Sequence, residues 1–357
     1  MIMLKFLWLL IIAISASLVS GCDSKPESEP DEPETPLFPK DPFDYPADEI
    51  ANYDYIYTTG VIIHGEFHDT NENPQLLEQL LAQSELQPTN VIEVSLPAAG
   101  KLEKLTREYA RIMDKLIVSG PINLKDLYYI RDCAAFFNLR SVDLSNATIE
   151  KNTIPPLAFT KSMYHNDKIT LVMLPIFNID LPENLEHIRM CAFRDMLRTS
   201  IKFPASLKTL EAWCFMNTVL LGGDIIIPEG TEYIDTECFD HSGDHSGNHI
   251  GHISIPSSVK SLSNKAFNVT YAESISLSEG LEDIMGNSLP NNIETLILPS
   301  TLKVFFLIWT PTAVPHLKEI YCLPSTPPYA AINYPEGITV YVAKDDLQKY
   351  TSDRVWS

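Results

Sequence analysis

Residues 255–267 read IPSSVKSLSNKAF, and variants of this stretch recur along the chain. Three further copies are clear: LPENLEHIRMCAF at 181–193, FPASLKTLEAWCF at 203–215 and IPEGTEYIDTECF at 227–239. Weaker copies begin at Leu277 and Leu298. The six copies start 22, 24, 28, 22 and 21 residues apart, a period typical of proteins built by stacking one small structural unit.

The spacing of apolar residues predicts the shape of each unit. Before the proline, apolar residues such as Leu296 and Leu298 alternate, which suits a short strand with one buried face. The proline cannot donate the next ladder hydrogen bond, so the strand ends there. After it, the apolar positions trace one side of a short helical turn. Such a unit buries its apolar edge only against identical neighbours, so the pattern predicts a stacked array.

The same repeats resemble the BspA-like (treponemal-type) leucine-rich-repeat family of bacterial surface proteins. The L-P-x-x-L-x-x-I-x-x-x-A-F cadence carries the resemblance, which covers about 91–357. It implies an α/β fold: a right-handed leucine-rich-repeat solenoid in a horseshoe-like arc. Parallel strands would line the concave face and short helical turns the other. Apolar residues before Pro175 and before Pro182 both fit a strand, and the sequence does not decide between them.

The N-terminus predicts export and lipidation. Lys5 and a short apolar run give 1–21 the form of a lipoprotein signal peptide, and Leu18-Val19-Ser20-Gly21-Cys22 resembles a lipobox. Acyl chains on Cys22 would make membrane anchoring effectively permanent. Residues 22–49 are acidic and proline-rich, which predicts an extended tether. We therefore expect an outer-membrane lipoprotein exposed at the cell surface.

The rest of the chain divides into a cap segment at 50–90 and the repeat domain at 91–357, with a C-terminal cap near 317–357. The formal charge of the chain is −21; the signal contributes +1 and the tether −8, which leaves −14 on the body. No basic stretch interrupts this charge, so we expect no nucleic-acid partner. The sequence also lacks nucleophile-elbow, phosphate-loop and dinucleotide motifs, so we predict neither an enzyme nor a bound cofactor.

A binding surface is the leading functional hypothesis. The residues that point outward from the predicted strands are mostly small and polar, which suits a broad protein or glycan ligand. They are Asp143, Asn178, Ser200, Asp224, His252, Ser274, Thr295, Glu319 and Tyr321. Family members are associated with adhesion to host matrix proteins or to other bacteria, so the resemblance implies an adhesion ligand of that kind. A structural surface component without a specific ligand is an alternative.

Histidine clusters support a second alternative, a metal- or haem-associated lipoprotein. The insert between the third and fourth copies contains His241, His245, His249 and His252, which could hold zinc or copper. If 61–68 is one strand, then His64, Glu66 and His68 would share a face. The simpler interpretation of the insert is a polar surface loop.

Two cysteines fill a repeated core position. Cys214 and Cys238 stand where other copies have Ala192 and Ala266, so the position requires a small apolar group. We expect buried thiols there. A disulfide between adjacent turns is the alternative.

Overall fold

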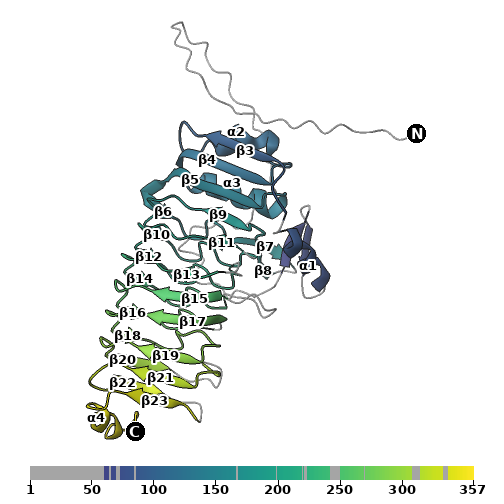
Figure 1. Cartoon of the computed structure of the whole chain (residues 1–357). Coiled ribbons are helices and arrows are strands. Elements are labelled where there is room, and N and C mark those ends of the chain that lie inside the picture. The colour runs from purple at the N-terminus through teal and green to yellow at the C-terminus, as the bar shows by residue number, and fades with distance from the viewer. Residues whose placement is uncertain are drawn as a thin grey trace, which may run out of the picture.

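The computed structural model describes residues 60–63, 66–69, 73–83, 86–165, 168–197, 199–218, 220, 223–241, 250–268, 270–307, 314–332 and 337–357. These residues form an elongated stack of turns, with β3 and α2 at one end and β23 and α4 at the other (Figure 1). A parallel-strand leucine-rich-repeat solenoid was predicted, and the structure confirms it, with little helix in the described residues. No helix in the described ranges is long and apolar enough to cross a membrane.

The strands that precede the repeat prolines form what we call the first face. Most neighbouring strands pair in parallel, because each turn presents the same backbone edge to the next turn; the pairs form three sheets, β3 to β11, β13 to β17 and β19 to β23. The rung near residue 180 is the one before Pro182, since the strand Asn178–Asp180 pairs with the preceding rung. The first-face strands are β3 (Val91–Ser95), β4 (Lys115–Ile122), β5 (Ser141–Ile149), β9 (Asn178–Asp180), β11 (Ser200–Ile201), β13 (Ile225–Ile226), β15 (Ile250–Ile255), β17 (Ala272–Leu277), β19 (Thr295–Leu298), β21 (Glu319–Cys322) and β23 (Thr339–Val342).

A second parallel sheet, the second face, runs along the opposite part of each turn. It replaces the predicted short helical turns, and that prediction is wrong for the repeats. After each proline the backbone makes a single tight turn, in which Leu207 N, for example, donates to Pro204 O. It then bonds to the neighbouring turn instead of continuing as a helix; Glu211 N donates to Ile188 O. The second-face strands are β6 (Thr153–Ile154), β10 (His187–Ile188), β12 (Thr209–Leu210), β14 (Tyr233–Ile234), β16 (Ser261–Leu262), β18 (Asp283–Ile284), β20 (Val304–Leu307) and β22 (Tyr329–Ile332).

Described helices lie mainly in the N-terminal part of the chain. In the first turns, α2 (Leu102–Thr106) and α3 (Leu124–Phe136) connect first-face strands, with short 3-10 turns at Arg107–Tyr109 and Glu150–Asn152. The side chain of Asn123 caps α3, and buried Asp126 accepts backbone hydrogen bonds from Asn123, Gly100 and Leu102. A final helix, α4 (Leu347–Thr351), lies at the C-terminal end (Figure 1).

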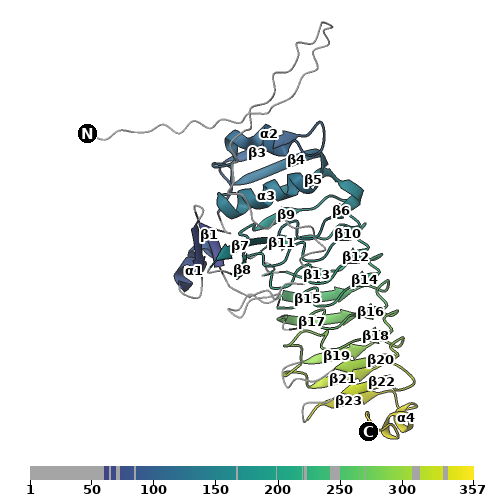
Figure 2. The same ribbon diagram turned by 180° about the vertical axis from the view of Figure 1, so that it is seen from behind.

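The described part of the predicted cap segment lies against the side of the solenoid. It consists of a hairpin, β1 (Gly60–Ile63) and β2 (Glu66–Asp69), followed by α1 (Pro74–Gln83). These elements lie beside a second hairpin, β7 (Lys161–His165) and β8 (Lys168–Val172), as both views show (Figures 1 and 2). Val61 and Leu80 form a small apolar cluster with Met173 and Leu197. The segment thus differs from the predicted end cap, because its apolar residues contact the middle turns.

A column of phenylalanine rings runs through the core. Phe159, Phe193, Phe215, Phe239 and Phe267 stack in sequence, with centroids 5.0, 5.2, 5.2 and 4.9 Å apart. All five side chains are fully buried. The ring spacing is close to the separation of adjacent β-strands, about 4.8 Å. Each ring therefore belongs to one turn and contacts the equivalent ring of the next.

The residue before each ring must be small because the backbones approach closely there. Phe193 N donates to Cys214 O and Phe215 N donates to Cys238 O, both at 2.8 Å. The residue before this small residue has a positive φ, which is 60° at Trp213 and 54° at Glu237. This conformation turns the chain sharply toward the core. The predicted preference for Ala or Cys at this position is consistent with its complete burial.

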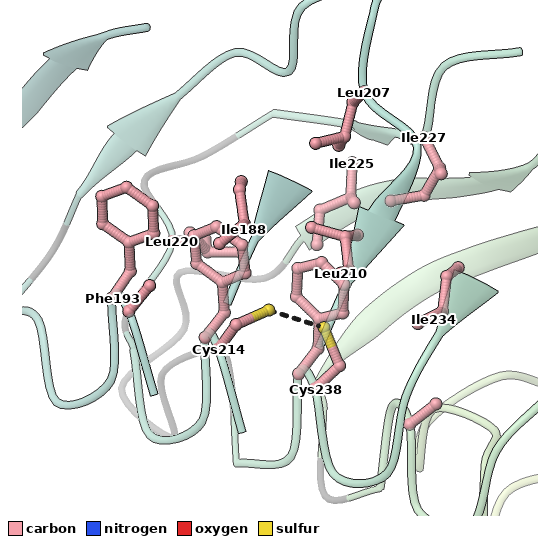
Figure 3. Close-up of a cluster of buried hydrophobic side chains, with 14 of the residues drawn as sticks. Ile188, Phe193, Leu207, Leu210, Cys214, Leu220, Ile225, Ile227, Ile234 and Cys238 are labelled. Atoms are coloured by element: carbon pink, nitrogen blue, oxygen red, sulfur yellow. Dashed lines mark hydrogen bonds between the residues drawn. The ribbon is translucent and has the colours of Figure 1, made fainter. Parts of the chain in front are cut away.

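Cys214 and Cys238 lie against each other in adjacent turns (Figure 3). Their Sγ atoms are 3.0 Å apart, and all five described cysteines are free thiols. Burial raises the pKa of the Cys214 thiol well above its usual value, and the neighbouring Cys238 thiol adds to this. The predicted buried thiols match the structure.

Replacing Phe239 with alanine should lower the free energy of unfolding by about 3–5 kcal/mol, because it removes a ring from the middle of the column and leaves a cavity. The measurement is thermal or denaturant unfolding of the purified protein. Tyr233→Ala is the matched control, because the Tyr233 side chain is half-exposed on the second face. Equal stability losses in the two variants would contradict this account of the core.

Alkylation should label none of the five described cysteines in the native protein and all five after denaturation. Burial excludes the reagent and disfavours the thiolate; it raises the pKa of Cys191 to about 11. Mass spectrometry counts the labels. If denaturation without a reductant leaves Cys214 and Cys238 unlabelled, the pair is a disulfide instead.

Candidate functional site

Among the described residues the first face is interrupted twice, between β11 and β13 and between β17 and β19, and a pocket lies at the first interruption. We consider the interruption between β11 and β13. Each of these strands pairs with a neighbour on its other side, but among the described residues they do not pair with each other. The copy that begins at Phe203 is followed by the next after 24 residues, two more than the preceding interval. Thr199 bridges Leu220, four residues ahead of Asp224. β11 begins directly after Thr199, whereas β13 begins five residues after Leu220, so the two strands are displaced relative to each other along the rung.

Gly223 makes this displacement possible. Its φ of +142° lies in a region that side-chain-bearing residues rarely adopt. Gly223 O still accepts a hydrogen bond from Gly251 N on the far side, so β13 remains joined to β15. Gly223 therefore lies where the chain begins to pair with β15.

A pocket of about 530 Å³ opens at this interruption. Its walls are largely apolar and include Phe203, Leu220, Ile225, Ile226 and Ile250. Polar side chains complete the lining: Glu183, Thr199, Ser200, Lys202 and Asp224. An apolar cavity of this size with a few polar groups has the character of a ligand site.

The nine residues predicted to form a binding surface all lie on the first face, on its strands or, for Asp224, directly before β13. Asp143, His252 and Glu319 are partly exposed and the other six are exposed. Most occupy one row across the strands: Asn178 is level with Ser200, His252 with Ser274, and Thr295 with Glu319. Asp143 is level with Asp180 and Tyr321 with Ile297, so these two belong to a second row two residues further along.

Hydrogen bonds join part of the first row. The Asp224 carboxylate accepts from His252 N at 2.9 Å. The two ring nitrogens of His252 lie 2.8 Å from Ser274 Oγ and 2.9 Å from Ser276 Oγ. These contacts fix the imidazole against two serines of β17. The row is thus a fixed polar surface next to the pocket.

An aromatic pair lies at the C-terminal end of the same face. The rings of Tyr321 and Tyr341 stack with centroids 4.6 Å apart, and both hydroxyls donate to Glu319. The Glu319 carboxylate raises the pKa of Tyr341 through this hydrogen bond. Exposed Ile297 is level with Tyr321 and continues the row. Tyr341 lies within the predicted C-terminal cap near 317–357 and is not one of the nine predicted surface residues.

The second histidine hypothesis rests on a strand that the structure does not contain. Residues 61–68 form a hairpin in which Val61 is level with His68 and Ile63 with Glu66. His64 lies outside the described residues. The premise of one continuous strand over 61–68 is therefore wrong, because β1 and β2 pair antiparallel; Glu66 and His68 lie two residues apart on β2, and a site that includes His64 stays a prediction.

The histidine-rich insert is only partly described. His245 and His249 lie outside the described residues, so a four-histidine site stays a prediction. His241 Nδ1 lies 3.0 Å from Asp240 Oδ1, a contact that raises the pKa of the imidazole. In the described ranges no three histidine, cysteine or acidic residues are grouped closely enough to hold a metal ion.

Comparison with known proteins identifies the repeats. The family model of the BspA type leucine rich repeat region, in six copies, matches residues 173–246 and 242–306. The crystal structure of the pneumococcal vaccine antigen PcpA is similar at 13% identity over 67% of this chain and 76% of that chain, with a TM-score of 0.19. A TM-score this low is insufficient to show a shared overall shape. No curated protein sequence matches the chain.

If the insert is only a surface loop, adding zinc should leave the melting temperature of the protein unchanged. Deleting residues 242–246 should also have little effect without metal, because each doubling of loop length costs only about 0.6 kcal/mol. Differential scanning calorimetry with and without zinc measures both effects. A zinc-dependent rise in the parent protein that the deletion abolishes would show a metal site, since a ligand of the folded state raises its stability.

Proposed function

This chain is a BspA-like leucine-rich-repeat protein, and on that premise we propose that it is a surface lipoprotein that binds a protein or glycan ligand through its first face. The pocket between β11 and β13 supports the proposal most directly. It lies at an interruption of the first face, its walls combine apolar and polar residues, and two predicted contact residues, Ser200 and Asp224, border it. A structural surface component without a specific ligand would not need such a pocket.

The surroundings of the pocket also favour binding over catalysis. Leucine-rich-repeat solenoids are typically binding scaffolds without enzymatic activity, and the first face offers a long, rigid surface. Its polar row is held by hydrogen bonds between side chains, as at His252, so little side-chain entropy would be lost on contact. Exposed Ile226, Ile297 and the tyrosine pair would add apolar contact area beside the polar row.

The lipidated anchor at Cys22 is the second part of the proposal. A thioether-linked lipid on this residue would hold the protein at the outer membrane, and the acidic tether would separate the solenoid from the bilayer. A solenoid attached in this way would present its first face to host matrix proteins, to glycans or to other cells.

Filling the pocket should prevent binding. Ser200→Trp places a large ring at the pocket lining, whereas Ser261→Trp places the same ring on the second face and serves as the matched control. Binding would be measured on arrays of extracellular matrix proteins and mucin glycans with the purified soluble body. We expect the first variant to lose binding by about tenfold or more, which corresponds to about 1.4 kcal/mol, and the control to match the parent.

Two outcomes would contradict the proposed function. If the parent protein binds no probe on either array, a structural surface component is the better interpretation. If Ser200→Trp and Ser261→Trp bind as well as the parent, the ligand contacts another part of the molecule.

Cys22→Ser should release the protein from the membrane fraction, because without the acyl chains the chain loses its proposed anchor. Detergent phase separation of cell extracts measures the shift, with Ser24→Ala as a control that leaves the lipobox-like sequence intact. A Cys22→Ser protein that still enters the detergent phase would disprove anchoring through this residue.

A further inference from the structure

Three paired strands at the C-terminal end of the first face carry an exposed aromatic surface. Along β19, β21 and β23, outward-facing residues alternate with residues that are buried or half-buried. None of the outward-facing residues lines the pocket between β11 and β13. We call these six residues the tyrosine surface; in two rows across the strands, they are Thr295, Glu319 and Thr339, and Ile297, Tyr321 and Tyr341.

The two tyrosine rings are stacked, and one face of the Tyr341 ring is directed away from the stack. The ring centroids are 4.6 Å apart and the planes differ by 12°, so the rings of Tyr321 and Tyr341 face each other across β21 and β23. Among the described residues β23 is the last strand of this sheet, and Tyr341 is 42% exposed. The ring face of Tyr341 that is opposite Tyr321 is therefore available to a ligand.

Glu319 gives this surface one fixed negative charge. Its two carboxylate oxygens accept hydrogen bonds from the Tyr321 and Tyr341 hydroxyls at 3.3 and 3.2 Å. No lysine or arginine in the described ranges forms an ion pair with Glu319, and the neighbouring Lys318 has its Nζ 2.6 Å from the Glu294 carboxylate instead. Glu319 is thus the single charged residue of the six, and its carboxylate is not neutralised by a cation.

We propose that the tyrosine surface binds an arginine side chain on an exposed segment of a partner protein. This inference rests on the proposed function and adds to the first face a second contact of defined chemistry. A guanidinium is planar, stacks on aromatic rings and donates hydrogen bonds to carboxylates. The Glu319 carboxylate lies 3.2 Å from the Tyr341 hydroxyl, so one guanidinium can contact both the carboxylate and the open ring face.

The charge of the whole chain favours the same kind of partner. The formal charge is −21, and the field of an acidic protein attracts cationic segments and accelerates their association. A neutral glycan would also contact the tyrosine rings, but its binding would not depend on a positive charge. An anionic glycan would be repelled by Glu319. The charge of the ligand is therefore the property to test.

The first measurement compares two peptides that differ in charge alone. One is a flexible glycine-serine peptide with interspersed arginines. In the other, citrulline replaces each arginine, which keeps the size and planarity of the side chain and removes its charge. Isothermal titration calorimetry with the purified soluble body measures both affinities. We expect the arginine peptide to bind about tenfold more tightly than the citrulline peptide.

A pair of charge variants separates a local site from general attraction to an acidic protein. Glu319→Gln should lower the affinity for the arginine peptide by about fivefold, because it removes the charge but keeps an oxygen that accepts from the tyrosine hydroxyls. Glu273→Gln is the matched control, since it removes an equal charge from an exposed residue of β17. We expect its affinity to stay within about twofold of the parent.

A second pair of variants tests the ring. Tyr341→Leu removes the ring but keeps an apolar side chain, and it should weaken binding of the arginine peptide by about fivefold. Tyr341→Phe keeps the ring and loses the hydroxyl, so it should stay within about twofold of the parent. The citrulline peptide should not distinguish these variants, whereas a merely structural role of Tyr341 would weaken both peptides equally. Circular dichroism checks folding, and the two glutamate variants decide the question if Tyr341→Leu does not fold.

Three results would overturn the inference: equal affinities of the arginine and citrulline peptides, equal losses in Glu319→Gln and Glu273→Gln, or a folded Tyr341→Leu variant that binds the arginine peptide as well as the parent does. The proposed function fails separately. If Ser200→Trp abolishes binding on the arrays and the arginine peptide is insensitive to Glu319→Gln, only the inference about the tyrosine surface is wrong. If the arrays show no binding while the arginine peptide depends on Glu319 and Tyr341, the tyrosine surface binds a cationic segment and the proposed role of the pocket is wrong.

Discussion

The whole structure depends on the match between the spacing of stacked aromatic rings and the spacing of paired strands. Phe193, Phe215 and Phe239 stack 5.2 Å apart, and parallel strands pair at about 4.8 Å. Both faces of each turn can therefore be hydrogen-bonded while the core stays closed. The sharp turn before each ring, with positive φ at residues such as Trp213, brings the ring into line. A substitution that places a smaller side chain in this column of rings should therefore also lower the stability of the neighbouring turns.

Because the inward positions hold the stack together, the outward positions are free to carry function. Small changes in the length of a turn are then absorbed at one face without loss of the core. The two additional residues before β13 illustrate this point, since β12 and β14 remain paired while β11 and β13 separate. The pocket lies at one of the two places where the first face is not continuous, beside the row of polar residues that includes Asn178 and His252.

Sequence periodicity predicted the rungs well and the rest of each turn less well. The strand before each proline, the small residue at Cys214 and the buried ring at Phe239 follow from one repeated pattern. The segment after the proline was misassigned as helical. Its apolar spacing at Leu207 and Leu210 fits a helical turn in isolation, but the neighbouring turn supplies parallel hydrogen-bond partners at Thr209 and Leu210. Periodicity alone does not distinguish these two structures for so short a segment.

The sequence by itself determined the solenoid, the register of its rungs and the outward position of residues such as Ser200 and Ser274, because each depends on a spacing that repeats along the chain. Only the tertiary structure decided where the stack departs from regularity. The spacing of 24 residues and the pair Gly222-Gly223 are visible in the sequence. Whether such a longer repeat interrupts the sheet depends on how β11 pairs with β9 and β13 with β15. The hairpin at 60–69 was missed for the same reason, since its partners Met173 and Leu197 lie about a hundred residues away in the sequence.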